Sequence, residues 1–250
     1  MRPPQIIALV FLAIILLGSA LLCLPAASKR GEPTDFLTSL FTATSATCVT
    51  GLVRVDTGTY WSGFGQAVIL VMIQIGGLGF MTIASIFFFT LRRKIGLRQR
   101  LVLAQALSFD QISGVVGLVK NVLLGTLAVE GAGALILMLR FWPEFGLGRA
   151  VWYGMFHSVS AYCNAGFDVL GDLASGGSLC GYVDDPVVNL TIMALIIVGG
   201  IGFLTWEDVK RNRLHFSRYR MQSKVILVTT AVLIAAPAAW FFFFEFSELP

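Results

Sequence analysis

Two stretches of the sequence, FTATSATCVTGL at residues 41–52 and FHSVSAYCNAGF at residues 156–167, are near-copies of each other. Phe, Ser, Ala, Cys and Gly are identical at five matched positions, at a constant offset of 115 residues. Each copy follows one long apolar segment and precedes another. Internal repeats of long period usually determine the architecture. The repeat therefore predicts two units, each made of an apolar helix, a short loop that enters the membrane and returns, and a second apolar helix.

The composition is that of a membrane protein. The chain is 56% hydrophobic and 13% charged, with a mean hydropathy of +0.82, whereas a soluble domain carries about 25% charged residues. Crossing the hydrocarbon takes about 20 apolar residues. The predicted fold class is an all-α integral membrane protein built from repeated helix–pore loop–helix units, as in potassium channels. We expect five spans, at about residues 5–24, 64–91, 119–141, 187–206 and 224–244.

The first apolar segment also has features of a signal peptide. Arg2 precedes it, and the small residues of LPAAS at 24–28 follow it. A signal-peptide core has about 7–15 residues, and the apolar run from Ile6 to Leu24 is longer. We therefore interpret it as a membrane span.

Charge predicts the orientation of these spans. The N-terminus and the segments 92–120 and 207–224 hold 13 of the 18 Lys and Arg residues and only three acids. An excess of Lys and Arg marks the cytoplasmic face, so the N-terminus is expected in the cytoplasm. Segments 33–55 and 147–170 must then enter and return on the outer side. Basic loops also occur in nucleic-acid-binding proteins, but the flanking spans favour topology, and no nucleic-acid partner is expected.

These elements divide the chain into four predicted parts. The first repeat covers 1–95, a cytoplasmic loop covers 96–118, and the second repeat covers 119–210. Residues 211–250 contain a further cytoplasmic loop and the first helix of an incomplete third repeat.

The two loops have a composition that suits a half-span. Residues 36–53 are uncharged, and seven of these 18 residues are Ser or Thr; residues 150–167 are again uncharged. In each, about a dozen residues can form a helix and the last few return as extended chain. Extended backbone survives at membrane depth only where it is buried in protein or lines a wet cavity. There its carbonyl groups can bind a dehydrated cation, and Gly51 and Gly166 suit such a path because glycine accepts positive φ.

A second repeated motif lies in the return helix of each unit. Residues 75–82 read IGGLGFMT and residues 198–205 read VGGIGFLT, at an offset of 123. Small residues let membrane helices approach closely. We interpret these glycines as sites of helix packing or helix deformation, with a direct gating role as the less favoured alternative. They are Gly76, Gly77, Gly79, Gly199, Gly200 and Gly202.

Three other sets of polar residues need an interpretation. Glu130 is the only acid deep in a span, which makes it a functional candidate; we favour a buried partner for loop N–H groups or for a basic side chain. Asp168 and Asp172 flank the second loop on the outer side and would attract cations, although an ordinary solvated loop is as well supported. His157 and Ser160 lie one helical turn apart, but no third residue orients them, so catalysis is not expected.

The combined motifs resemble the Trk/Ktr potassium uptake family, and specifically its ion-translocating membrane subunit. The resemblance rests on TSATCVTGL at 44–52, QIGGLG at 74–79 and NAGFD at 164–168. It implies a bacterial plasma-membrane protein that takes up K+ through a backbone-carbonyl filter, with Na+ or H+ coupling left open. It also implies a homodimer and a cytosolic nucleotide-binding regulatory subunit. The implied filter residues are Cys48, Val49, Thr50, Gly51, Cys163, Asn164, Ala165 and Gly166, and K+ is the only metal ion expected, with no cofactor.

The sequence departs from the family pattern in one respect. Family members carry four such repeats around one pore, and this chain has two, so it resembles the N-terminal half and we expect a fragment or a truncated product. The alternative function is a non-transporting membrane scaffold or partial subunit that needs another chain to complete the pore. An intramembrane enzyme is a third and much weaker alternative.

Overall fold

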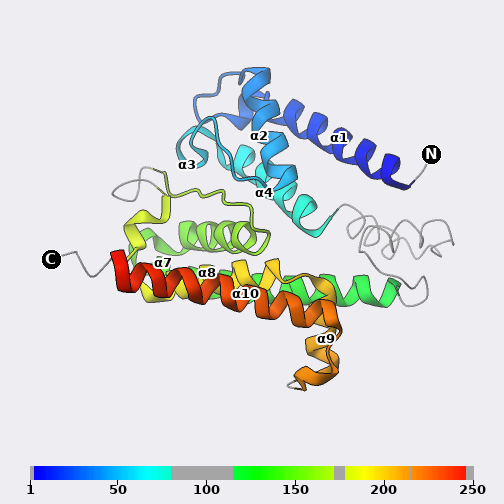
Figure 1. Cartoon of the computed structure of the whole chain (residues 1–250). Helices are drawn as coiled ribbons and strands as arrows, with labels where there is room; N and C mark the ends of the chain where they lie inside the picture. The colour runs from blue at the N-terminus through cyan, green and yellow to red at the C-terminus, as the bar shows by residue number, and fades with distance from the viewer. Residues whose placement is uncertain (1–2, 80–114, 172–177, 214, 246–250) are drawn as a thin grey trace. The chain divides into compact units, whose positions relative to one another are not determined.

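The computed structural model describes residues 3–79, 115–171, 178–213 and 215–245, and these residues are helical with no β-strand (Figure 1). The prediction of a mostly helical protein is therefore confirmed. Two predicted features lie largely outside the described residues: the cytoplasmic loop 96–118, and the end of the return span 64–91. The helices are α1 (Pro3–Leu22), α2 (Phe36–Cys48), α3 (Thr57–Tyr60), α4 (Gly63–Leu78), α7 (Val115–Tyr162), α8 (Pro186–Gly200), α9 (Phe203–Asn212) and α10 (Met221–Trp240).

The chain forms two compact units, Met1–Gly199 and Gly200–Pro250. In the first unit, α1, α2 and α4 pack against one another, as the blue and cyan helices of Figure 1 show. Short helical turns η1 (Pro25–Ala27) and η3 (Ser178–Tyr182) belong to its connections. The second unit contains α9, α10, the turn η4 (Phe216–Arg218) and the π-helical turn η5 (Phe241–Glu245).

The helix α2 is short, polar and buried on one side. Asp35 caps its first turn by accepting a hydrogen bond from the Thr38 backbone N–H at 3.2 Å, which satisfies one of the donors that a helix start leaves unpaired. Its buried residues are small: Thr38, Ser39, Thr42, Ala43, Ser45, Ala46 and Thr47. Small side chains let neighbouring helices approach closely without a large apolar core. The Ser and Thr content read from the sequence thus becomes a packing surface for α1 and α4.

Helix α7 is two helical segments that meet at Gly146. Gly146 has φ 75° and ψ 161°, which is outside the helical region, and the second segment folds back along the first. The pairing is antiparallel, because Ser158 Oγ donates to the Glu130 carbonyl at 2.6 Å while a Cβ on Gly154 would lie 2.7 Å from the Ala134 carbonyl oxygen. In Figure 1 the two segments run side by side. Residues 147–162 therefore lie beside the segment of α7 that precedes Gly146.

The predicted continuous span 187–206 is wrong in one respect. The structure has α8 up to Gly200 and α9 from Phe203, with a break at residues 201–202. The physical reason is Gly202, whose φ of 82° and ψ of 152° are not helical and are readily adopted only by glycine. The matched residue of the first repeat, Gly79, ends α4 with φ 73° and ψ 135°. The third glycine of each motif therefore has a similar non-helical backbone at a helix boundary: Gly79 follows the end of α4, and Gly202 precedes the start of α9.

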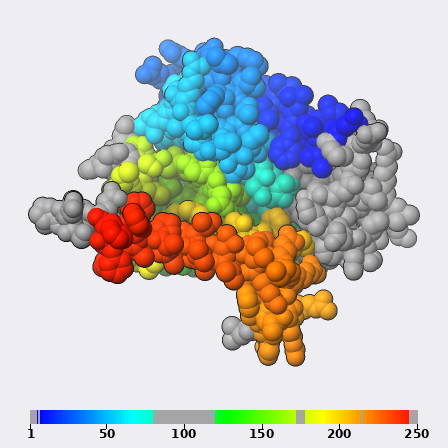
Figure 2. Space-filling model, viewed as in Figure 1, coloured from blue at the N-terminus to red at the C-terminus, as the bar shows by residue number. Residues whose placement is uncertain are grey.

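Length and apolar composition identify two described helical stretches that could cross a membrane, 120–162 and 221–244, and a third if α8 and α9 form one broken span. The folding back at Gly146 divides the first of these. Shorter apolar helices occupy Ile7–Leu22 and Gly63–Leu78. Large apolar side chains lie on the surface of α10, including Val225, Val228 and Leu233, along the orange-to-red rod in Figure 2. Such exposed apolar area is typical of contact with lipid or with another protein.

Candidate functional site

The two repeated loops have the same backbone shape. Val49 and Asn164, at matched positions, have φ of 57° and 58°, and Gly51 and Gly166 both have φ of 72°. A left-handed conformation is rare for a residue with a side chain, and it is least expected for the β-branched Val49. Such strain costs about 1–3 kcal/mol per residue and persists only where the surroundings impose it, often at functional sites.

Equivalent hydrogen bonds hold the two loops. The Thr50 backbone N–H donates to the Ser45 carbonyl at 3.0 Å, and the Ala165 N–H donates to the Ser160 carbonyl at 2.7 Å. The two serine hydroxyls add further bonds. Ser45 Oγ lies 2.9 Å from Thr50 Oγ1, and Ser160 Oγ donates to the Phe167 carbonyl at 2.6 Å.

The N–H groups of the matched residues Thr50 and Ala165 are thus used, whereas the loop carbonyls are not. Within the part of the chain that the structure describes, no hydrogen bond reaches the carbonyl oxygens of Val49–Gly51 or Asn164–Gly166. These six carbonyls, three in each repeat, are therefore available for another partner.

The two glycines approach each other across the repeat interface. A Cβ on Gly51 would lie 2.6 Å from the Ala165 carbonyl oxygen and 3.4 Å from the Gly166 Cα. A Cβ on Gly166 would lie 3.6 Å from the Gly51 Cα. The structure therefore brings together two loops that are 115 residues apart in the sequence.

Glycines of the second motif let each return helix pack closely against the end of the short helix before it. The return helices are α4 and α8, and the short helices are α2 and the second segment of α7. A Cβ on Gly76 would clash with the Thr47 carbonyl oxygen, and a Cβ on Gly199 would clash with the Tyr162 carbonyl oxygen. Thr47 and Tyr162 are themselves matched by the repeat. A Cβ on Gly77 would meet the Cys163 side chain.

The remaining glycines of this motif differ in role. Gly79 and Gly202 have open space where a Cβ would lie, so their positive φ and not a close contact requires glycine. Gly200 is the last residue of α8.

Comparison with known proteins bears on this arrangement. The model of the TrkH family, described as cation transport protein, matches residues 5–249. The chain belongs to the TrkH family. Its sequence is 42% identical over 234 residues to the potassium/sodium uptake protein NtpJ of Enterococcus hirae, which covers 94% of this chain and 51% of the relative. It is 43% identical over 246 residues to the Ktr system potassium uptake protein B of Bacillus subtilis, with 98% and 54% covered. The Vibrio alginolyticus protein of the same name is 36% identical, with 97% and 52% covered.

The recognition of the Trk/Ktr family from the sequence is therefore confirmed. The chain spans about half the length of these relatives. Each of the three is named as an uptake protein and none as an enzyme.

In this TrkH-family chain, Glu130 joins both repeats. The Gln74 side-chain amide donates to its two carboxylate oxygens at 3.0 and 3.2 Å, and the Cys163 thiol lies 3.9 Å from Oε1. Glu130 is 5% exposed. We expected a loop N–H group or a basic side chain as its partner, and that expectation is wrong. A carboxamide and a thiol take this place because QIGGLG and the end of the second loop both pack against this part of α7.

The outer acid Asp168 serves its own loop. Its Oδ1 accepts from the backbone N–H groups of Leu170 at 3.1 Å and Gly171 at 3.5 Å. The other predicted outer acid, Asp172, lies outside the described residues.

The pair His157 and Ser160 has no catalytic geometry. His157 Nδ1 bonds to the Tyr153 carbonyl at 2.7 Å, while the Ser160 hydroxyl is used by Phe167. A general base must accept the proton of the hydroxyl that it activates, and here the Ser160 hydroxyl donates to a carbonyl, while His157 Nε2 has no partner among the described residues.

Sequence reasoning missed a polar cluster on the predicted outer side. Arg140 pairs with Asp185 and, at 3.6 Å, with Glu144, and the Tyr182 hydroxyl donates to Glu144 at 2.8 Å. Desolvation opposes ionisation of Asp185, but hydrogen bonds from the Val188 N–H and from Arg140 outweigh it and hold the pKa of Asp185 below its usual value. Two signals were readable: the i,i+4 spacing of Arg140 and Glu144, and an Asp directly before a Pro at a helix start.

Proposed function

We propose that the two loops are two segments of a cation filter whose ligands are backbone carbonyl oxygens. The observation that carries this proposal is the set of unpaired carbonyls at Val49–Gly51 and Asn164–Gly166, held by matched φ angles and matched serine hydrogen bonds. Oxygen dipoles of this kind replace the hydration shell of a dehydrated ion. Cys48 and Cys163 complete the filter segments at their inner ends.

The proposed activity is uptake of K+ across the plasma membrane. Its support comes from the family and from the relatives, which are named as potassium or potassium/sodium uptake proteins. The excess of Lys and Arg in the basic segments supports a cytoplasmic N-terminus. Na+ or H+ as a coupling ion, a homodimer, and a cytosolic nucleotide-binding regulatory subunit are parts of the same proposal. The name "Ktr system" carried by two relatives agrees with a protein that works with other components.

Two filter segments supply half of a four-sided site, so a partial subunit is the second candidate function. Rubidium flux into liposomes that contain only this purified chain separates the two. Selective flux requires copies of the chain to assemble a pore, and its absence favours a subunit that another chain completes.

Serine substitutions at the two glycines test the filter. Gly51→Ser and Gly166→Ser are expected to abolish K+ selectivity of rubidium uptake in cells that lack other potassium uptake. Gly31→Ser is the matched control, because Gly31 has φ 70° and nothing within 4 Å of a built Cβ. It carries the same backbone strain away from the loops. Unchanged selectivity in both loop variants at normal expression would contradict the proposal.

A further inference from the structure

A pocket of about 630 Å³ lies on the predicted outer side of the first unit, and Val169 and Leu170, which follow the second loop, are among its lining residues. Its volume falls within the range of about 300–1,000 Å³ that is usual for small-molecule sites. Lys29 and Arg149 line it, and none of the described lining residues is Asp or Glu. The charged side chains of the lining are therefore both basic, while the nearest described carboxylates, Asp56 and Asp168, are bonded to the backbone N–H groups of the lining residues Thr59 and Leu170.

The two basic side chains of this pocket differ from Arg54 and Arg140 in their pairing. Of the outer bases, Arg54 lies 3.7 Å from Asp35 and Arg140 pairs with Asp185. Neither Lys29 nor Arg149 has an ion pair among the described residues. Lys29 Nζ donates one hydrogen bond, to the Gly58 carbonyl at 2.5 Å, which leaves two of its three donors.

Local backbone adds to the positive potential. Gly63 begins α4, and Gly148 lies in the first turn of the second segment of α7, and both line the pocket. Helix starts carry unpaired N–H groups and the positive end of the helix dipole. The built Cβ of each glycine meets nothing within 4 Å, so the space beside both helix starts is open.

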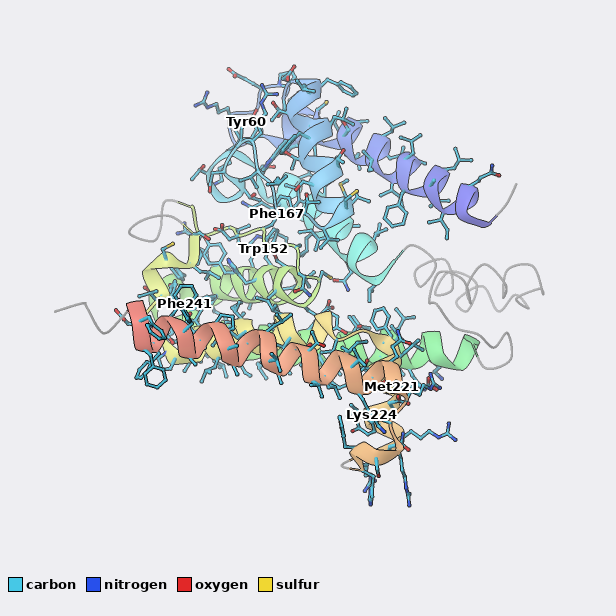
Figure 3. The ribbon with its side chains drawn as sticks, in the orientation of Figure 1. Tyr60, Trp152, Phe167, Met221, Lys224 and Phe241 are labelled. Carbon is cyan, nitrogen blue, oxygen red and sulfur yellow. The ribbon has the colours of Figure 1, made fainter. Side chains whose placement is uncertain are left out.

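The surroundings suit a lipid headgroup. Trp152 and Tyr153 line the pocket, and Trp152 is held by its Nε1–H bond of 2.8 Å to Gln66 Oε1. Trp and Tyr concentrate at the level of lipid headgroups. In Figure 3, Trp152 is labelled on α7, and Tyr60, next to the lining residue Thr59, is labelled on α3.

Apolar side chains beside the pocket provide a place for acyl chains. Leu147 and Val151, on the same helical segment as Arg149, are 51% and 45% exposed, and Phe64 on α4 is 44% exposed. A free anion would use the two cations only, whereas a phospholipid would also cover these side chains.

We propose that this pocket binds the phosphodiester headgroup of an anionic glycerophospholipid, such as phosphatidylglycerol, in the outer leaflet. Arg149 would contact the phosphate oxygens with its planar fork of donors, and Lys29 would contact them from the opposite wall. The proposal rests on the proposed membrane location but not on ion transport, because its readout is bound lipid.

Native mass spectrometry of the purified chain in detergent, titrated with phosphatidylglycerol or with phosphatidylcholine, tests the pocket. The double variant K29Q/R149Q is expected to lose affinity for phosphatidylglycerol by about tenfold or more, since charge-assisted hydrogen bonds are the strong ones. Phosphatidylcholine binding should stay unchanged. R30Q is the matched control, because it removes an adjacent outer base that does not line the pocket.

A steric variant separates the pocket from general charge. Gly148→Leu keeps both cations but fills the open space, and it should also weaken phosphatidylglycerol binding. Gly125→Leu, at another helical glycine with open space, should not. Equal lipid binding in K29Q/R149Q and in the unaltered chain would overturn the proposal. Competition by soluble glycerophosphoglycerol as strong as that by the intact lipid would also overturn it, in favour of a free phosphodiester site.

Discussion

Alanine substitutions at three glycines separate backbone strain from contact within the paired loops. Gly31, Gly51 and Gly166 have φ of 70°, 72° and 72°, so the left-handed penalty of about 1–2 kcal/mol is common to all three. What differs is the space for a Cβ. At Gly31 this space is open. A Cβ added at Gly166 would lie 3.6 Å from its nearest atom, and a Cβ added at Gly51 would lie 2.6 Å from the Ala165 carbonyl oxygen.

The expected loss in the free energy of unfolding follows from these distances. At Gly51 the Cβ would fall about 0.8 Å short of the 3.4 Å at which ordinary contact begins. The neighbouring atom is a backbone oxygen and cannot rotate away, so one loop must move. Overpacking of this kind costs about 1–3 kcal/mol. We therefore expect Gly51→Ala to destabilise the chain by about 2–5 kcal/mol in total, and Gly166→Ala and Gly31→Ala by about 1–2 kcal/mol.

The displaced oxygen belongs to one of the proposed ligands, so function should follow the same order. Rubidium uptake in the presence of competing Na+, at matched expression, should lose selectivity most in Gly51→Ala, less in Gly166→Ala, and not at all in Gly31→Ala. An equal loss in Gly51→Ala and Gly166→Ala would refute the contact argument. A loss in Gly31→Ala would show that left-handed strain alone explains the effect.

Three further predictions concern the surroundings of the loops. Glu130→Ala should lower the free energy of unfolding by about 1–3 kcal/mol, because it leaves the Gln74 amide without its acceptor. A double-mutant cycle with Gln74→Ala should show coupling between the two substitutions, and additive effects would contradict the contact. Gly76→Val and Gly199→Val should both abolish the folded peak in size-exclusion chromatography, since each places side-chain atoms against a backbone carbonyl, whereas Gly125→Val should keep it. Asp185→Asn should lower the melting temperature at neutral pH and have little effect in acid. Because the pKa of Asp185 is depressed in the folded state, its contribution is complete above its ordinary pKa and is lost as the pH falls through the depressed value; a pH-independent difference would argue against the ion pair with Arg140.

The sequence predicted the helical class, the repeat and the family, because apolar runs and a repeated motif are local signals. It did not predict the break at Gly202. Gly-Gly-x-Gly is equally compatible with close helix packing and with a helix boundary, and only the φ of 82° shows that a boundary lies at Gly202. The turn at Gly146 lies between the predicted end of a span at residue 141 and the predicted start of the second loop segment at residue 147, but the sequence did not locate it.

The partner of Glu130 could not be predicted from the sequence. Gln74 is 56 residues away and carries no charge, so no charge pattern indicates the pair. Asp168 shows the opposite case: a residue chosen for its charge is used by its own loop through Leu170. A local hydrogen bond of an Asp side chain to the backbone two residues on is a common turn feature, and it competed with the electrostatic interpretation.

The two repeats differ in length in a way that shows what determines the register of the loops. The loops match at an offset of 115 and the glycine motifs at 123, so the second unit holds eight more residues between them. Yet Gly76 meets the carbonyl of Thr47 and Gly199 meets the carbonyl of Tyr162, which are matched positions. The extra residues therefore lengthen the connection and do not change the position at which the return helix packs. Since a glycine against a carbonyl leaves little freedom to slide, this contact, and not the length of the connecting chain, positions each return helix against the end of the preceding short helix and so beside its loop of unpaired carbonyls.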